Sequence, residues 1–440
     1  MSNMHYLLNI GVSGIKSIKD EVRLEFYKKT INKDFEPDKY RIKAIYGENG
    51  SGKSAIITAI KIFQDIMIKD QYLSESKNQH FLNEIINKTT QHFHFWCEYL
   101  IDLDKEKLVH YYSIEIGRGN NGRYEIKHEL LKTKSGNYSN NNYKTLYESK
   151  DGELVHIKCA KNYRTEVEKK MANLLSTSSF NYLYIVHLNN INLKESNILA
   201  HIAINLMFSL SIKIYMAEED QHELYFLRKK LREIEFNDGN LIPGFNDAID
   251  SINDYSGVNE KLVTKEHFDS YKEKVEQLTR FIQLFKKDLI SIDIDSKENG
   301  DQYECELNMN YGSYRINKEF ESTGIKKLIR LFDCFTTVDK GGIVFIDEMD
   351  SNLNDVYLCK LIEYFMYYST GQLCFTTHNL DPMSVLKENK NSIDFLSSDN
   401  KLVSWTSRGN ATPENCYKNG MIEHSPFNID ATDFVGMFGE

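Results

Sequence analysis

The segment GENGSGKS, residues 47–54, sets a lysine and a serine directly after a glycine-rich stretch. It satisfies the pattern G-x-x-x-x-G-K-[ST], in which backbone N–H groups surround phosphate oxygens, the lysine contacts the β- and γ-phosphates and the hydroxyl ligates Mg²⁺. Glycines suit this role because they adopt positive φ and let the backbone approach a phosphate closely. We therefore predict a nucleotide site with Ser54 as a Mg²⁺ ligand. Its predicted nucleotide-binding residues are Gly47, Asn49, Gly50, Ser51, Gly52, Lys53 and Ser54.

Two acids in the second half of the chain suit the chemistry of phosphate hydrolysis. Asp347 and Glu348 follow an apolar run in GGIVFIDEMD, residues 341–350. An acid at the end of a strand beside such a loop holds Mg²⁺, so Asp347 is predicted as a metal ligand. Glu348 is predicted as the general base that polarises an attacking water. A solvated acidic turn is the plainer alternative, and the upstream phosphate loop favours the catalytic interpretation.

A histidine and a serine–glycine pair complete the candidate residues. His378 follows the apolar residues of GQLCFTTHNLD, residues 371–381, where it can bond a γ-phosphate or position water. Ser322 and Gly324 stand at the start of a predicted helix, and such a capped N-terminus attracts anions. A lone histidine or a capped helix is usually structural. A functional role for either is favoured only because both follow the phosphate loop in this order.

The elements that must position these residues are a buried sheet and its helices. IKAIY, residues 42–46, reads as a strand before the phosphate loop, and residues 343–346 and 373–375 read as further core strands. After the loop, apolar residues recur on one face of a helix. They are Ile56, Ile60, Phe63 and Met67. Strand, loop and helix in this order form a phosphate cradle, and the predicted fold class is α/β.

The rest of the chain divides into regions with different hydrophobic patterns. Alternating segments at 91–102, 107–117 and 124–134 predict an antiparallel β-lobe, followed by a polar loop or hairpin tip over 134–152. Helix-length amphipathic segments follow at 163–175, 201–216, 220–236 and 271–289. The predicted regions are an N-terminal lobe at 1–162, a helical insertion at 163–290 and a C-terminal lobe at 291–440.

Composition limits the partners and the location. The net charge is −10, so the basic footprint of a nucleic-acid binder is absent overall. The basic cluster at 228–232 is best interpreted as a solvated helix face, with a DNA contact as the alternative. The 7 cysteines are odd in number and lack CxxC spacing, which disfavours a disulfide framework or a zinc module. No run reaches the ~18 apolar residues that span a bilayer, and we expect a cytoplasmic protein.

The order of motifs resembles ABC-type ATPase heads of SMC, RecF and OLD-like proteins. The resemblance implies a P-loop NTPase head with a mixed sheet core and an antiparallel β-lobe, binding ATP and Mg²⁺. It also implies a homodimer or larger homo-oligomer, in which the signature of one chain completes the ATP site of another. Carried over, Lys53 and Ser54 match Walker A, Asp347 and Glu348 match Walker B, Ser322 and Gly324 match the signature and His378 matches the switch histidine.

Two further nucleotide contacts rest on the same resemblance. Lys16 and Ser17 match a basic–serine pair that lies near the nucleotide in these heads. A glutamine that helps to hold Mg²⁺ is matched by either Gln79 or Gln91, and the sequence does not choose between them.

Within this superfamily, IDEMDSNL and FTTHN resemble the compact AAA-family ATPases of anti-phage and abortive-infection systems. The chain departs from them in SNLND, residues 351–355, where S-L-H-P is usual, and in ESTG, where a doubled serine or serine–glycine–glycine is usual. The resemblance implies an enzyme that hydrolyses ATP to ADP and phosphate and acts as a sensor or regulator. We expect a separate effector protein, a nuclease or toxin, because the stretch after His378 is short for an appended nuclease domain.

Three other classes compete with this reading. A RecF- or SMC-like ATPase of DNA repair or recombination shares the motifs and differs in its substrate. A transporter ATPase fits poorly, because no membrane segment is found and the insertion is long. A simple P-loop kinase or GTPase is disfavoured by the serine–glycine helix and the late histidine.

Overall fold

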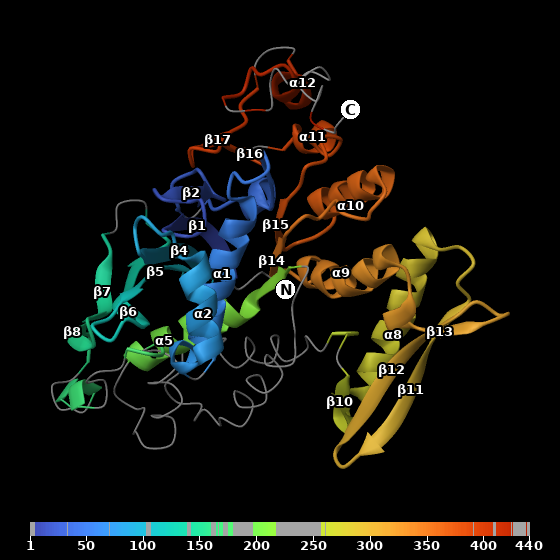
Figure 1. The fold of residues 1–440 in the computed structure, drawn as a ribbon, viewed down its shortest axis with the longest axis horizontal. Helices are drawn as coiled ribbons and strands as arrows, with labels where there is room; N and C mark the ends of the chain where they lie inside the picture. Colours follow the sequence, from blue (N-terminus) through green and yellow to red (C-terminus); the bar gives the residue numbers. More distant parts are fainter. Residues whose placement is uncertain are drawn as a thin grey trace.

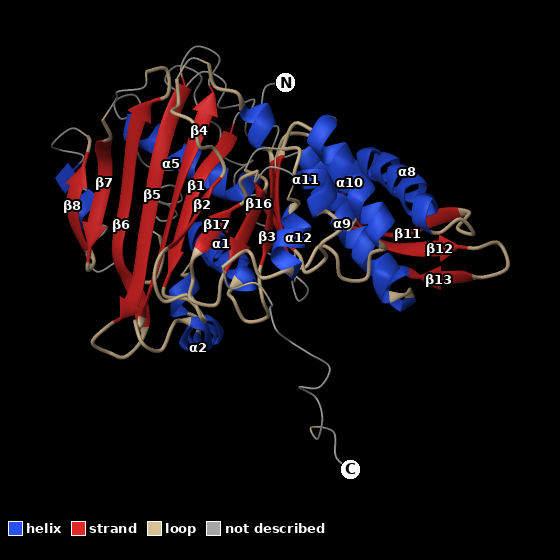
Figure 2. Ribbon diagram, turned by 90° about the horizontal axis from the view of Figure 1, so that it is seen from above, coloured by secondary structure: helices blue, strands red, loops and turns tan. Residues whose placement is uncertain are grey.

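The computed structural model shows a chain built in layers around two large sheets (Figure 1). An antiparallel sheet lies on one side, a mainly parallel sheet lies in the centre, and a smaller sheet with its own helix lies on the far side (Figure 2). The structure describes residues 5–32, 34–69, 71–102, 107–138, 142–159, 197–216, 257–259, 261–389, 391–407 and 411–423, with the short stretches 164–165, 167–169, 175–178, 425 and 437.

The antiparallel sheet has seven strands in the order β2-β1-β4-β5-β6-β7-β8. The strands predicted at 91–102, 107–117 and 124–134 are confirmed as β4, β5 and β6. Residues 134–152 were predicted as a hairpin tip or a loose loop, and the loose loop is wrong for β7, where Leu146 and Tyr147 are buried and Tyr147 pairs with Leu131 of β6. The strands are β1 (His5–Ser13), β2 (Val22–Glu25), β4 (His92–Asp102), β5 (Lys107–Arg118), β6 (Tyr124–Ser135), β7 (Lys144–Lys150) and β8 (Glu153–Ile157).

The central sheet runs β17-β16-β3-β15-β14-β9, and all its strands except β17 are parallel. The core strands predicted at 42–46, 343–346 and 373–375 are confirmed as β3, β14 and β15. Because carboxyl ends of parallel strands share one edge, the phosphate loop, the Walker B acids and the histidine come together there. The strands are β3 (Ile42–Tyr46), β9 (Ile212–Tyr215), β14 (Ile343–Ile346), β15 (Gln372–Thr376), β16 (Ile393–Leu396) and β17 (Leu402–Ser404).

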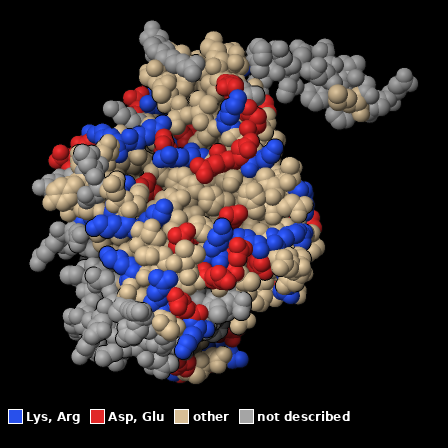
Figure 3. Space-filling model, turned by 90° about the vertical axis from the view of Figure 1, so that its left-hand side faces the viewer, with Lys and Arg blue, Asp and Glu red and all other residues tan. Residues whose placement is uncertain are grey.

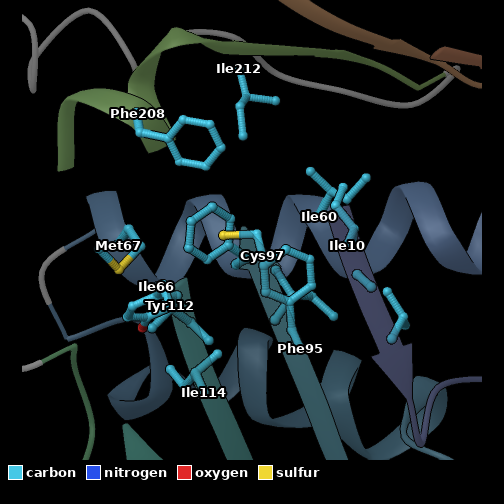
Figure 4. Packing of buried hydrophobic residues seen from close by; sticks show 14 of the residues in the cluster. Ile10, Ile60, Ile66, Met67, Phe95, Cys97, Tyr112, Ile114, Phe208 and Ile212 are labelled. Atoms are coloured by element: carbon cyan, nitrogen blue, oxygen red, sulfur yellow. The ribbon is translucent and has the colours of Figure 1, made fainter. Parts of the chain in front are cut away.

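Helices α1 (Lys53–Ile68) and α5 (Asn197–Ser211) fill the space between the two large sheets. The Phe63 ring of α1 stacks on Phe95 of the antiparallel sheet at 4.7 Å. Figure 4 shows Phe95 and Tyr112 below α1, while Phe208 lies on its other side. Because α1 is covered from both sides, nearly all its residues are buried, and its N-terminus is held firmly at the sheet edge.

The opposite face of the central sheet is covered by helices that follow the acidic and histidine strands. The smaller sheet, with order β10-β12-β11 and β13 paired to β12, packs with α8 against α9. These elements are α8 (Phe268–Phe285), α9 (Thr323–Asp339), α10 (Asp355–Tyr367), α11 (Met383–Leu386), α12 (Pro413–Lys418), β10 (Leu262–Thr264), β11 (Ser291–Asn299), β12 (Gln302–Asn310) and β13 (Arg315–Asn317). A short helix, α2 (Ser76–Ile85), follows α1.

Of the region expected as a helical insertion, residues 163–290, the described helices α5 and α8 belong to different layers. The prediction of one helix over 201–216 is wrong at its end, because residues 212–215 form β9 and pair with β14. The helix predicted at 271–289 is confirmed in α8, which packs with the smaller sheet. The helix predicted at 220–236, including the basic cluster 228–232, lies outside the described residues.

Three histidines cluster where α5 meets the antiparallel sheet, with His5 and His110 buried and His201 partly buried. His110 Nε2 lies 2.8 Å from His201 Nδ1, and His5 packs edge-on against Phe208. Burial lowers the pKa of His5 and of His201 to about 4, and it lowers the pKa of His110 well below its usual value. The folded chain therefore keeps these rings neutral at pH values where unfolded histidine binds a proton.

We predict that the chain loses stability as the pH falls from about 6.5 towards 4. Replacing His5 by Phe should reduce the difference in unfolding free energy between pH 7 and pH 5 by about 2 kcal/mol. Urea unfolding at the two pH values measures this difference. Replacement of the exposed His80 by Phe is the control and should leave it unchanged, whereas a full pH dependence in the His5 variant would contradict the prediction.

Candidate nucleotide-binding site

The loop between β3 and α1 has the backbone that a phosphate cradle requires. Gly50 and Gly52 have φ of +83° and +106°, in the left-handed region that residues with a side chain rarely adopt. A Cβ at Gly52 would also lie 2.9 Å from Ile18 Cγ1 and 3.2 Å from Ser17 Oγ. The turn that carries Ser17 is therefore packed against the phosphate loop, and a nucleotide contact by Lys16 and Ser17 stays a prediction.

The side chain of Lys53 folds back onto the backbone of the phosphate loop. Lys53 Nζ donates to the carbonyl oxygens of Gly47 and Glu48, at 2.8 and 2.9 Å. Burial lowers the pKa of Lys53, and nearby acids, first of them Asp347, oppose that shift. The hydroxyl of Ser51 is buried without a hydrogen-bond partner in the described chain. An unpaired buried donor inside a glycine-lined loop at a helix N-terminus is a fit for phosphate oxygens.

The two predicted Mg²⁺ ligands are hydrogen-bonded to each other. Ser54 Oγ donates to Asp347 Oδ1 at 3.1 Å, although the residues are 293 positions apart. Thr376 Oγ1 donates to the same oxygen at 2.6 Å, and the N–H of Glu348 donates to Thr376 Oγ1 at 2.8 Å. A hydroxyl beside a carboxylate is the oxygen ligand set that Mg²⁺ prefers, so these residues would hold the ion.

Glu348 and His378 stand at the same edge and are both exposed. Glu348 has φ of 48°, an unusual backbone conformation for a residue with a side chain. Partial burial lowers the pKa of His378, the Lys53 ammonium lowers it further, and Asp350 and its neighbouring acids oppose this. The imidazole is therefore neutral at pH 7 and can accept or donate one hydrogen bond.

Three residues near this edge were not predicted. Thr376 bridges Asp347 and Glu348, Asp350 acts electrostatically on Lys53 and His378, and Lys327 bonds the turn that follows the acids. Thr376 lies close to His378 in FTTHN and Asp350 lies close to Glu348 in IDEMD, so their position beside predicted residues was a usable signal. Lys327 carried no such signal, because it lies in a helix and reads as a solvated residue.

The other predicted contacts are placed as follows. Lys16 Nζ reaches Thr58 Oγ1 of α1 at 3.4 Å. Gln79 donates to the carbonyls of Leu73 and Tyr124 and accepts from the Tyr124 N–H, so its amide joins α2 to β6. Gln91 is exposed and bonds only weakly to a neighbouring carbonyl, at 3.3 Å. Neither contact involves Ser54 or Asp347, so the choice between Gln79 and Gln91 stays open.

The signature pair lies at the exposed start of α9. Ser322 Oγ accepts from the Ile325 N–H at 3.4 Å, which caps the helix as predicted. Ser322 is exposed, and a Cβ at Gly324 would lie 3.2 Å from the carbonyl oxygen of Asn352. The helix N-terminus thus lies beside the loop after the Walker B acids, with its capping residue open to solvent.

The parallel sheet, the glycine loop and the paired Ser54 and Asp347 define a P-loop NTPase. A protein-family comparison matches residues 42–381 to the family described as "AAA domain, putative AbiEii toxin, Type IV TA system". Because the match covers well over half of the chain, the protein belongs to this family of P-loop ATPases, which generally bind ATP with Mg²⁺. No curated protein matches the chain. Within the described residues, every helix is too short or too polar to cross a membrane.

We predict that replacing Lys53 by Met weakens ATP binding about 10- to 100-fold, because the change removes a charge-assisted contact to phosphate. Titration with a fluorescent ATP analogue measures the affinity. Lys61, also on α1 but paired with Asp65, provides the control, and its replacement by Met should leave the affinity near that of the wild type. Equal affinities for the Lys53 variant and the wild type would refute the assignment.

Proposed function

We propose that the chain is an ABC-type ATPase head that closes a homodimer around ATP and hydrolyses it to ADP and phosphate. The observation that carries this proposal is the Asp347 carboxylate, which accepts from Ser54 Oγ beside the phosphate loop and from Thr376 Oγ1 beside Glu348. It gathers phosphate-binding, metal-binding and water-activating groups at one sheet edge.

Each group has a role that its chemistry supports. The loop N–H groups and Lys53 would hold the β- and γ-phosphates, and Ser54 and Asp347 would hold Mg²⁺, which neutralises charge on the phosphates. Glu348 would accept a proton from the attacking water. His378, neutral at pH 7, would orient that water or bond the γ-phosphate.

The proposal of a dimer depends on the start of α9. Ser322 is exposed, and Gly324 adds no side chain to the helix N-terminus, so a second chain's phosphate can approach it. Meanwhile α1, the helix that follows the phosphate loop, packs on the opposite face of the central sheet from α9. Two chains arranged head to tail would bring each serine-capped helix to the other's phosphate loop.

We further propose a cytoplasmic regulator of a separate effector, a nuclease or toxin, in defence against phage. The family description names a toxin and a toxin–antitoxin system, which supports a partner protein. ATP binding would favour the closed dimer and hydrolysis would reopen it, and the effector would bind one of these states better.

We expect that replacing Glu348 by Gln traps ATP-bound dimers or larger assemblies, because phosphate contacts persist while the general base is lost. Gel filtration with light scattering, with and without ATP, measures the mass. Glu363→Gln, at an exposed position on α10, is the matched control and should behave as the wild type. A Glu348→Gln chain that stays monomeric with ATP would count against the dimer.

A mixing experiment tests whether the ATP site is shared between chains. Lys53→Met lacks a working phosphate loop, and Ser322→Arg blocks the helix start, so each variant alone should hydrolyse ATP slowly. A mixed dimer holds one intact site, made of the loop of the Ser322→Arg chain and the helix of the Lys53→Met chain. Mixing should therefore restore part of the turnover, and no recovery despite mixed dimers would refute a shared site.

DNA repair remains the alternative, and the surface of the antiparallel lobe does not favour it. Lys and Arg are interspersed with Asp and Glu on the face shown in Figure 3, where no one-signed basic stripe is seen. A nucleic-acid site requires clustered positive charge. Binding to DNA ends with a steep dependence on salt concentration would move the assignment to the RecF-like class.

A further inference from the structure

Lys327 on the second turn of α9 is buried beneath the turn that carries the general base. Its side-chain ammonium donates to the carbonyl oxygens of Glu348 and Ser351, at 2.6 and 2.7 Å, and to the hydroxyl of Ser351. The residue is only 5% exposed. An ammonium has three N–H donors, and this turn provides three acceptors.

These bonds act on a backbone conformation that needs support. Glu348 has φ of 48°, and this left-handed conformation is costly for a residue with a Cβ. The hydroxyl of Thr376 accepts from the Glu348 N–H. The Glu348 carbonyl accepts from Lys327 and from the Ser351 N–H. The Glu348 backbone is therefore held at both its N–H and its carbonyl. This fixes the direction of the Cα–Cβ bond from which the side chain extends.

The same ammonium also contacts the strand beside the Walker B strand. Lys327 Nζ lies 5.9 Å from the ring centroid of Tyr215, and the Tyr215 carbonyl accepts from the Asp347 N–H at 2.9 Å. Burial lowers the pKa of Lys327 to about 8, although nearby acids oppose that shift. The group is therefore mostly protonated at pH 7, so its three bonds are charge-assisted and stronger than neutral ones.

We infer that Lys327 is a positioning residue, which links the start of α9 to the orientation of Glu348. Ser322, Gly324 and Lys327 belong to the same end of one helix, so a shift of the capped N-terminus moves the ammonium and the turn it holds. The inference rests on the proposed function, in which a second chain's nucleotide contacts that N-terminus. Contact of that nucleotide with the N-terminus of α9 would then change the orientation of Glu348, the general base of the same chain.

A bland alternative is that Lys327 only stabilises the turn. The two readings differ in what a substitution changes. A purely structural lysine would affect folding and ATP affinity together, whereas a positioning lysine affects turnover and leaves binding intact. The split between kcat and KM, together with the melting temperature, separates them.

The experiment replaces Lys327 by Met and by Arg in the full chain, with Lys360→Met as the matched control. Lys360 is an exposed lysine on α10, and its side chain is 73% exposed. We expect Lys327→Met to lower kcat about 10- to 100-fold with KM within a few-fold of the wild type, because small misplacements of a catalytic group have effects of this size. Lys327→Arg keeps a charged donor but not the compact three-donor geometry of the ammonium, so it should recover part of the lost turnover.

Each outcome decides the inference. A Lys327→Met chain with wild-type kcat overturns it, and so does a loss of ATP affinity and melting temperature with kcat unchanged. If Lys327→Met does not fold, Lys327→Gln, which keeps an N–H donor, is measured by the same criteria. If the wild type hydrolyses ATP and Glu348→Gln does not, a fully active Lys327→Met refutes this inference alone. A wild type without ATP turnover overturns the proposed function and this inference with it.

Discussion

The carboxylate of Asp347 joins three stretches of the chain. Asp347 directly follows β14, and one oxygen of its carboxylate accepts from a hydroxyl of α1 and from a hydroxyl of β15. Parallel strand pairing brings these ends to one edge, but it does not orient their side chains. The two hydrogen bonds to Asp347 supply that orientation, and through the Thr376 hydroxyl they extend to the backbone of Glu348.

The positions of these hydrogen-bonded groups are well defined because the register of the strands beneath them is fixed. Lys43 of β3 and Asp394 of β16 form a buried ion pair at 2.6 Å, with side chains 2% and 0% exposed. A shift in register would leave both charges unpaired in the core, which is far more costly than losing a surface pair. The amide of Gln372 also bonds the backbone of Leu7 in both directions, and so ties β15 to the antiparallel sheet.

The sequence predicted an element of the fold correctly where a residue pattern has only one physical cause. The glycine loop and the runs Ile42–Tyr46 and Ile343–Ile346 predicted the parallel core, because strands buried on both faces are apolar apart from paired residues such as Lys43. The same rule hides the boundary between α5 and β9, since helix and strand are both buried there and neither shows a period. Lys327 could not be ranked from sequence, because its importance lies in contacts with Glu348 and Ser351 that no local pattern indicates.

The departure of SNLND from the pattern usual in related ATPases has a local explanation. Asn352 has φ of 59°, and asparagine tolerates this left-handed conformation better than most residues. Asn354 caps α10, since its side chain accepts from the Val356 N–H at 3.0 Å. A Cβ at Gly324 would meet the Asn352 carbonyl oxygen, and Lys327 bonds the Ser351 carbonyl oxygen, both backbone atoms that any residue would supply. The changed side chains therefore serve the turn and the following helix, while the backbone contact between this loop and α9 does not depend on them.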